Sequence, residues 1–150
     1  MIESVLTILI IAGSASLFAY WFRYTCLLIL SAKTTRDYAA DVATANQLSF
    51  LEVQAQLRGD GQPDLDRLHA SLDRDYALIN SLIQSASSSQ VESGIEDRML
   101  QLNYRLMGAW YGVSRRFSAE MGRRALDEMS LVVAHFANSM GERAACASAA

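Results

Sequence analysis

The segment from Val5 to Phe22 contains no charged residue. As a helix rising 1.5 Å per residue it would be about 27 Å long, close to the thickness of the hydrocarbon core of a bilayer. The four residues at the start of the chain include no Lys or Arg, and no clear small-residue cleavage site follows the run, so a cleaved signal peptide is disfavoured. We therefore expect one uncleaved transmembrane helix within residues 1–32.

Aromatic residues gather at the end of this run. Tyr20, Trp21 and Tyr24 surround Arg23, a composition typical of the level of the lipid headgroups. Basic residues follow the run and only Glu3 precedes it, so the positive-inside rule predicts an outside N-terminus and a C-terminal domain in the cytoplasm. The expected location is the cytoplasmic (inner) membrane of a bacterium.

Apolar sequence continues beyond Arg23, from Tyr24 to Ala32. The combined stretch would form about 42 Å of helix, more than one bilayer core accommodates. In one interpretation the span ends near Phe22, and Leu27 and Leu28 emerge and need cover from another protein. In the other, Arg23 lies within the membrane and needs a partner from another subunit.

A patch of small residues lies in the middle of the apolar run. Ala12 and Ser16 stand four residues apart, the spacing that lets two membrane helices approach closely. We regard these two residues as a candidate contact with another membrane helix, although chance explains such a pair about as well.

The remainder, 33–150, predicts a helical domain with almost no strand. Its single proline, Pro63, lies in a Gly-Asp-Gly-Gln-Pro turn, and Asp64 can cap the helix that follows. The expected helices span about 33–58, 64–86 and 90–145, the last beginning at one of two capping boxes, Ser89 with Glu92 or Ser93 with Glu96. The predicted fold is all-α: a transmembrane helix continuing into a long stalk helix, then an antiparallel three-helix bundle or coiled coil.

The last predicted helix changes the phase of its apolar stripe. Its first half places Met99, Leu102, Leu106, Val113 and Phe117 on one face. In the second half a rotated face carries apolar residues at three- and four-residue spacing, namely Leu126, Met129, Val133, Phe136 and Met140. Either the helix breaks near 118–124 and folds back to give a four-helix bundle, or it continues and presents the second stripe to another chain; the second alternative is slightly preferred.

Chemistry-bearing patterns are missing from the sequence. His69 and His135 stand far apart without a Glu-x-x-His pair, and the two cysteines, Cys26 and Cys146, cannot make a disulfide framework. No nucleophile motif or phosphate loop occurs. We therefore expect no catalysis, no cofactor and no metal, and we single out Trp110 and Tyr111 as candidate interface anchors.

Three functions remain open. The first is an accessory or scaffold subunit of a larger membrane complex, such as an energy-transducing assembly, bound to the other subunits through the membrane helix and the second half of the last helix. The second is a membrane-tethered adaptor or regulator that recruits soluble proteins, and the third is a homo-oligomeric assembly. A net charge of −3 disfavours nucleic acid as a partner.

Overall fold

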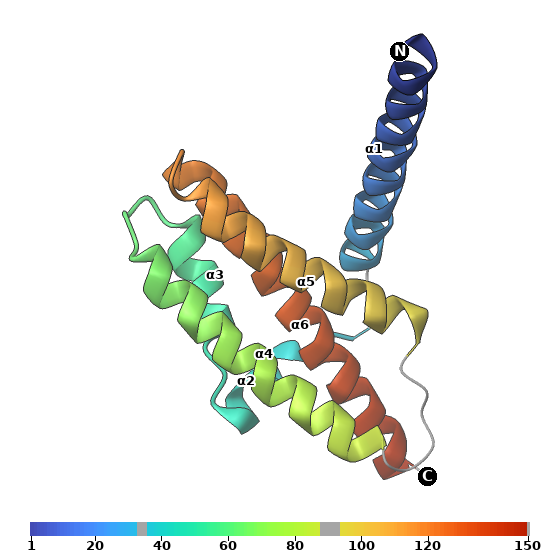
Figure 1. The fold of residues 1–150 in the computed structure, drawn as a ribbon. Coiled ribbons are helices and arrows are strands. Elements are labelled where there is room, and N and C mark those ends of the chain that lie inside the picture. The colour runs from blue at the N-terminus through green and yellow to red at the C-terminus, as the bar shows by residue number, and fades with distance from the viewer. Residues whose placement is uncertain (33–35, 88–93, 150) are drawn as a thin grey trace. The chain divides into compact units, whose positions relative to one another are not determined.

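In the computed structural model, which describes residues 1–32, 36–87 and 94–149, the chain forms six helices and no strand among those residues (Figure 1). It divides into two compact units, Met1–Ala32 and Lys33–Ala150. The first is a single helix and the second is a helical bundle. The all-α prediction is confirmed.

Helix α1 spans Ile2–Ser31 and is long and apolar enough to cross a membrane. Most of its side chains are exposed, and no residue in its most apolar 18-residue window is buried. The helix ends at Ala32, whose extended backbone (φ −62°, ψ 121°) stops the helical path. The sequence therefore supplies a long apolar helix that could cross a membrane and is largely exposed.

The predicted stalk helix over 33–58 is wrong. Two short helices replace it, α2 (Ala39–Asn46) and α3 (Phe50–Arg58), separated by Gln47 in the left-handed region at φ 53°. The break is stabilised from another helix, because the buried carboxylate of Asp75 accepts hydrogen bonds from the backbone N–H of Ser49 at 2.6 Å and from its hydroxyl at 3.1 Å. A tertiary contact therefore fixes the corner.

Helix α4 spans Leu65–Ser87 and matches the predicted second helix closely. The carboxylate of Asp64 accepts hydrogen bonds from the backbone N–H groups of Asp66 and Arg67, so the predicted cap is confirmed. Its apolar side chains Leu68, Leu72 and Ile79 are buried. Both predicted capping boxes for the next helix involve residues outside the described ones.

The predicted last helix is two helices, α5 (Ile95–Ser114) and α6 (Ala119–Ala149). The backbone N–H groups of Phe117 and Ser118 both bond to the carbonyl of Ser114, which closes the turn between them. Helix α6 folds back along α5 and packs against α2, α3, α4 and α5 (Figure 1). The fold-back alternative is therefore correct, and the preferred continuous helix was wrong.

Candidate functional site

The second apolar stripe of the predicted last helix is the core of the bundle. Leu126, Met129 and Val133 are completely buried, Phe136 is nearly so, and Met140 is half-buried. The prediction that these five residues bind another chain is therefore corrected. Folding back lets α6 bury that stripe against its own neighbours, so no partner is required there.

The candidate residues of α1 keep the exposure that a contact in the membrane needs. Ala12, Ser16, Leu27 and Leu28 are all exposed, and the hydroxyl of Ser16 donates a hydrogen bond to the carbonyl of Ala12 at 2.8 Å. That bond satisfies the hydroxyl within the helix. A neighbour would therefore meet a small, internally satisfied surface at this position.

The aromatic residues that were predicted to lie at the level of the lipid headgroups form a cluster on α1. Tyr20 and Tyr24 stack with ring centroids 6.3 Å apart, and Trp21 meets Tyr24 edge-on at 6.1 Å. All three rings are exposed, as is Arg23 between them. The cluster has the amphipathic character expected at a lipid headgroup layer.

Trp110 and Tyr111 point to different surroundings. Tyr111 is buried at 3% exposure, whereas Trp110 is 50% exposed. Trp110 belongs to a surface that we call the α5 stripe, which consists of Leu102, Leu106, Trp110 and Val113, each about half exposed, with the more exposed Ile95 at its start. The bundle therefore leaves one long apolar helix face uncovered.

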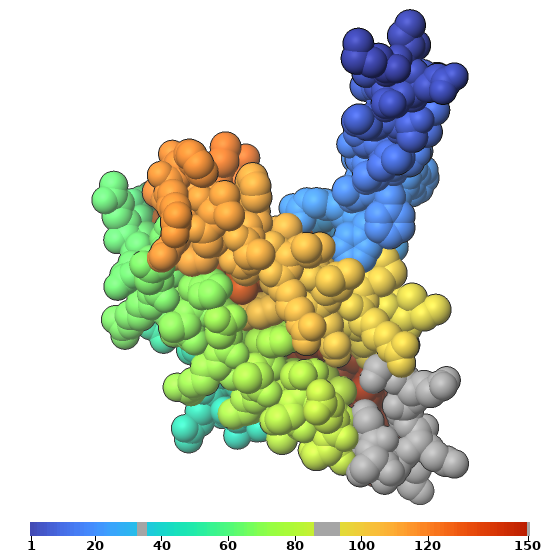
Figure 2. Space-filling model, viewed as in Figure 1, coloured from blue at the N-terminus to red at the C-terminus, as the bar shows by residue number. Residues whose placement is uncertain are grey.

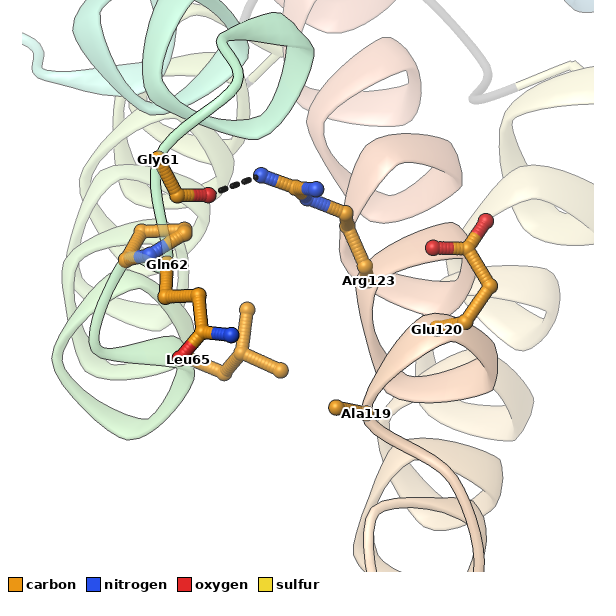
Figure 3. A pocket seen from close by; sticks show the side chains of 7 residues that line it. Gly61, Gln62, Leu65, Ala119, Glu120 and Arg123 are labelled. Atoms are coloured by element: carbon orange, nitrogen blue, oxygen red, sulfur yellow. Dashed lines mark hydrogen bonds between the residues drawn. The ribbon is translucent and has the colours of Figure 1, made fainter.

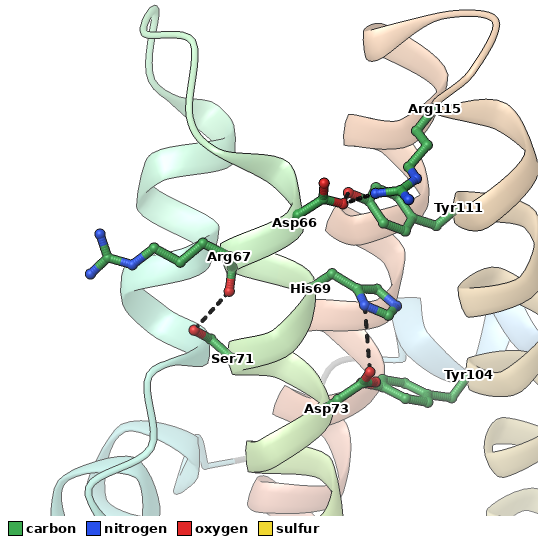
Figure 4. Close-up of polar contacts among 8 residues, drawn as sticks. All are labelled: Asp66, Arg67, His69, Ser71, Asp73, Tyr104, Tyr111 and Arg115. Carbon is green, nitrogen blue, oxygen red and sulfur yellow. Dashed lines mark hydrogen bonds and ion pairs between the residues drawn. The ribbon is translucent and has the colours of Figure 1, made fainter.

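The opposite face of α5 meets α4 through a polar and aromatic seam, drawn in Figure 4. The hydroxyl of Tyr111 donates to Asp66 at 2.8 Å, and that of Tyr104 donates to Asp73 at 2.9 Å. Since both pairs are seven residues apart and the helices run antiparallel, the same contact repeats after two turns. The seam thus fixes the register of α4 against α5.

Ring contacts complete the seam. His69 stacks on Tyr111 at 4.7 Å and Tyr76 on Tyr104 at 3.9 Å. The Nδ1 of His69 lies 3.4 Å from Asp73, and Arg115 pairs with Asp66 at the end of α5 (Figure 4). The sequence reasoning missed Asp66, Asp73 and Arg115 as partners; their signal was the seven-residue spacing of two acids opposite two tyrosines.

The seam shifts the acidity of its members. The hydrogen bond from Tyr111, with help from Arg115, lowers the pKa of Asp66. Burial raises the pKa of Tyr111 to about 12, and the bond to Asp66 adds to this effect. Burial and the charge of Asp73 raise the pKa of Tyr104 far above its usual value. Both tyrosines therefore remain neutral hydrogen-bond donors even above pH 10, a role suited to structure.

A second polar contact lies in the core between α5 and α6. The side-chain amide of Asn103 donates to the carboxylate of Glu128 at 2.9 Å, and both residues are buried. At the far end of α5, Arg143 of α6 pairs with Asp97 at 3.1 Å. These contacts fix α5 on α6 and leave the α5 stripe facing outward.

An open hollow lies between the turn before α4 and the start of α6 (Figure 3). Arg123 crosses it and donates hydrogen bonds to the carbonyls of Gly59 at 3.0 Å and Gly61 at 2.8 Å. Leu65, Ala119 and Glu120 complete the lining. The guanidinium of Arg123 therefore stabilises the turn before α4. Because this group is already bonded within the chain, we assign the hollow a structural role.

Side chains that could ligate a metal ion do not converge in the described part of the chain. There, no cluster of three or more His, Cys, Asp or Glu side chains could hold a metal ion. His69 lies in the seam, whereas His135 lies on α6 beside Phe136. The bundle offers exposed apolar and basic side chains for binding, and the α5 stripe is its most extended candidate binding surface.

Comparison with known proteins finds no match of this chain to a protein family, a curated protein or a solved structure.

Proposed function

We propose that this chain is a non-catalytic accessory or scaffold subunit of a larger membrane protein complex. In this proposal α1 spans the membrane and contacts other subunits, while the bundle forms a folded module beside the bilayer. The observation that carries the proposal is the contrast between the two units. The bundle buries a core of its own, whereas most apolar side chains of α1 are exposed and none in its most apolar 18-residue window is buried.

The charge distribution supports an orientation for this proposal. Glu3 precedes the span, and Arg23, Lys33 and Arg36 follow its apolar run. Under the positive-inside rule the N-terminus lies outside and the bundle lies in the cytoplasm, with the cytoplasmic (inner) membrane as the location. The stacked aromatic cluster around Arg23 would then mark the cytoplasmic interface.

One alternative function has a specific observation in its favour. The bundle forms a compact unit separate from α1, as a tethered adaptor that recruits soluble proteins would require. Assembly of several copies through α1 is the other alternative. All three functions use the same anchor, and they differ in which surface binds a protein.

Purification from the native membrane tests the accessory-subunit proposal. The full chain is extracted in mild detergent, and the proteins retained with it are identified by mass spectrometry. We expect stoichiometric membrane-protein partners. Replacing the small pair by Ala12→Leu with Ser16→Leu should release them by at least about tenfold, because close helix approach is lost.

A matched control places the same kind of change on the opposite face of α1. Thr7→Leu with Ser14→Leu also turns two small side chains into leucine, and we expect it to retain the partners. Recovery of the unaltered chain as a monomer, without other proteins, would refute the proposal. Retention of soluble proteins alone, still bound by the Ala12 and Ser16 variant, would favour the adaptor.

A further inference from the structure

The α5 stripe is a second apolar face on a helix that already has a buried one. Leu100 and Tyr104 face the core, whereas Leu102, Leu106 and Trp110 are each about half exposed. Phe117, in the turn after α5, is 81% exposed. In Figure 2 the residues of α5, yellow to orange, form a large part of the visible face of the bundle. The stripe is therefore extended and open.

Basic side chains border this stripe along one edge. At 100° per residue, Arg98 and Arg105 of α5 fall together on the same side of the apolar residues, and Arg116 follows in the turn after the helix. All three are exposed, and no ion pair joins them to a carboxylate within residues 1–32, 36–87 and 94–149. The nearby acid Glu120 is itself paired with Arg124 at 3.1 Å. The edge thus presents positive charge without a counterpart in the described chain.

An apolar helix face containing Leu and Trp, with arginines along its border, is the pattern of a helix that lies in the plane of a membrane surface. The apolar side chains enter the boundary between headgroups and acyl chains, and the guanidinium groups meet lipid phosphates. Charge complementarity therefore favours anionic phospholipid over a neutral lipid surface.

The covalent connection keeps the bundle close to such a surface. Residues 32–37 separate α1 from Tyr38, whose backbone N–H is already bonded to Asn138 of α6 at 2.7 Å. Seven steps of at most ~3.6 Å limit Tyr38 to about 25 Å from Ser31 at the end of α1. If α1 is anchored in the bilayer, the bundle therefore stays near the membrane surface, where the effective concentration of lipid is high.

We propose that α5 docks on the membrane surface, with the α5 stripe in the headgroup region and Arg98, Arg105 and Arg116 on anionic phospholipid headgroups. The inference rests on the membrane anchoring in the proposed function, and it does not depend on a protein partner. It makes the bundle a module that lies against the bilayer by way of one helix.

Trp110 provides a native probe for this docking. The chain has two tryptophans, so the full-length Trp21→Phe variant reports on Trp110 alone. It is reconstituted into vesicles of phosphatidylcholine, or of phosphatidylcholine with phosphatidylglycerol, each with and without brominated acyl chains. Because both leaflets have the same composition, the direction of insertion does not affect the result. We expect bromolipid quenching and a blue-shifted emission that are stronger in the anionic vesicles.

Two charge variants in this background separate the basic edge from general charge. Arg98→Gln with Arg105→Gln should weaken the docked state by about fivefold for each arginine and reduce quenching toward the level in phosphatidylcholine. Arg67→Gln with Arg74→Gln removes the same charge from α4 and should retain the quenching. Circular dichroism checks that both variants keep their helix content.

Several outcomes would overturn the docking. If bromolipids in anionic vesicles do not quench Trp110, the docking is excluded. It is also excluded if the quenching is the same in anionic and neutral vesicles and is unchanged in the Arg98 and Arg105 variant. If Trp110 is shielded only when a native protein copurifies, the stripe would be assigned to that protein.

The accessory-subunit proposal and the docking proposal can fail separately. A chain that has no protein partners but whose Trp110 is quenched by bromolipid refutes the accessory-subunit proposal alone. A chain that retains partners but shows no quenching refutes only the docking.

Discussion

At the scale of single residues, the tyrosines between α4 and α5 show how polar groups can specify a helix pair. Tyr104 is 4% exposed, yet its hydroxyl is satisfied by Asp73 at 2.9 Å. A buried hydroxyl without such a partner would destabilise the fold. The contact therefore favours one register between the helices, since a shift of one turn would leave both groups unpaired.

The raised pKa of Tyr104 predicts a loss of stability in alkali. Below pH 10 the tyrosine is neutral in both states; above pH 10 it ionises in the unfolded chain while the fold keeps it protonated, so the free energy of unfolding falls as pH rises. Tyr111 acts in the same direction up to its pKa of about 12. Tyr104→Phe should reduce the slope above pH 10 by up to ~1.4 kcal/mol per pH unit. Urea unfolding in detergent at pH 9, 10 and 11 measures it.

A matched tyrosine outside the bundle provides the control. Tyr20 lies exposed on α1, so Tyr20→Phe should leave the slope of the unfolding free energy unchanged. Equal slopes for the parent chain and the Tyr104→Phe variant would show that burial of Tyr104 does not link folding to pH.

At the scale of the elements, close packing of α6 on α2 depends on Gly141. A Cβ added there would lie 2.4 Å from the Cβ of Tyr38 and 3.2 Å from Cγ2 of Val42, so α2 would have to move. Gly141→Ala should destabilise the bundle by about 1–3 kcal/mol because the strain exceeds the gain in helix propensity. The midpoint of urea unfolding measures the change.

Gly112 on α5 is the matched control, because a Cβ added there meets no atom within 4 Å. Gly112→Ala should be neutral or should stabilise the bundle by up to ~1 kcal/mol. If Gly141→Ala were equally harmless, α6 would not approach α2 as closely as the coordinates indicate.

Periodicity predicted two apolar stripes in the region of α5 and α6, but the expectation that the second stripe meets another chain was wrong. The stripe with Leu102 and Trp110 is exposed, and the stripe with Leu126 and Val133 is the core. On α5 the buried face carries Tyr104 and Tyr111, whose hydroxyls make that face seem less apolar than its opposite. Their partners belong to α4, and the sequence of one helix cannot reveal them.

The break between α2 and α3 was hidden for a similar reason. No glycine or proline lies between Lys33 and Leu57, so local sequence favours one continuous helix. The left-handed Gln47 is accommodated because Asp75, twenty-six residues after Ser49, satisfies the backbone at the corner. Local signals were sufficient for α1 and for the Asp64 cap of α4, where the decisive contacts lie within a few residues.

At the scale of the whole molecule, the two units treat their apolar side chains differently. Most side chains of α1 remain exposed, as a helix that crosses a membrane would require, whereas α2 to α5 pack around α6 and exclude water from a shared core. Among the described residues, one buried apolar side chain, Cys26, belongs to α1, whereas the others, including Phe50, Leu72, Leu100 and Met129, come from the bundle. The stability of the bundle should therefore not require the anchor.

This independence predicts that cutting the chain between the two units releases a folded bundle. A protease site inserted between Asp37 and Tyr38 would separate α1 from the contact of Tyr38 with Asn138. After cleavage, far-ultraviolet circular dichroism of the released bundle should be helical, and its thermal midpoint should agree with that of the intact chain within about 4 °C, the shift that about 1 kcal/mol would cause. The exposed α5 stripe should make the released bundle self-associate in gel filtration as its concentration rises. Loss of helix content on cleavage would mean that α1 contributes to the fold of the bundle. A released bundle that stays monomeric at high concentration would mean that the α5 stripe is too weakly apolar to drive self-association.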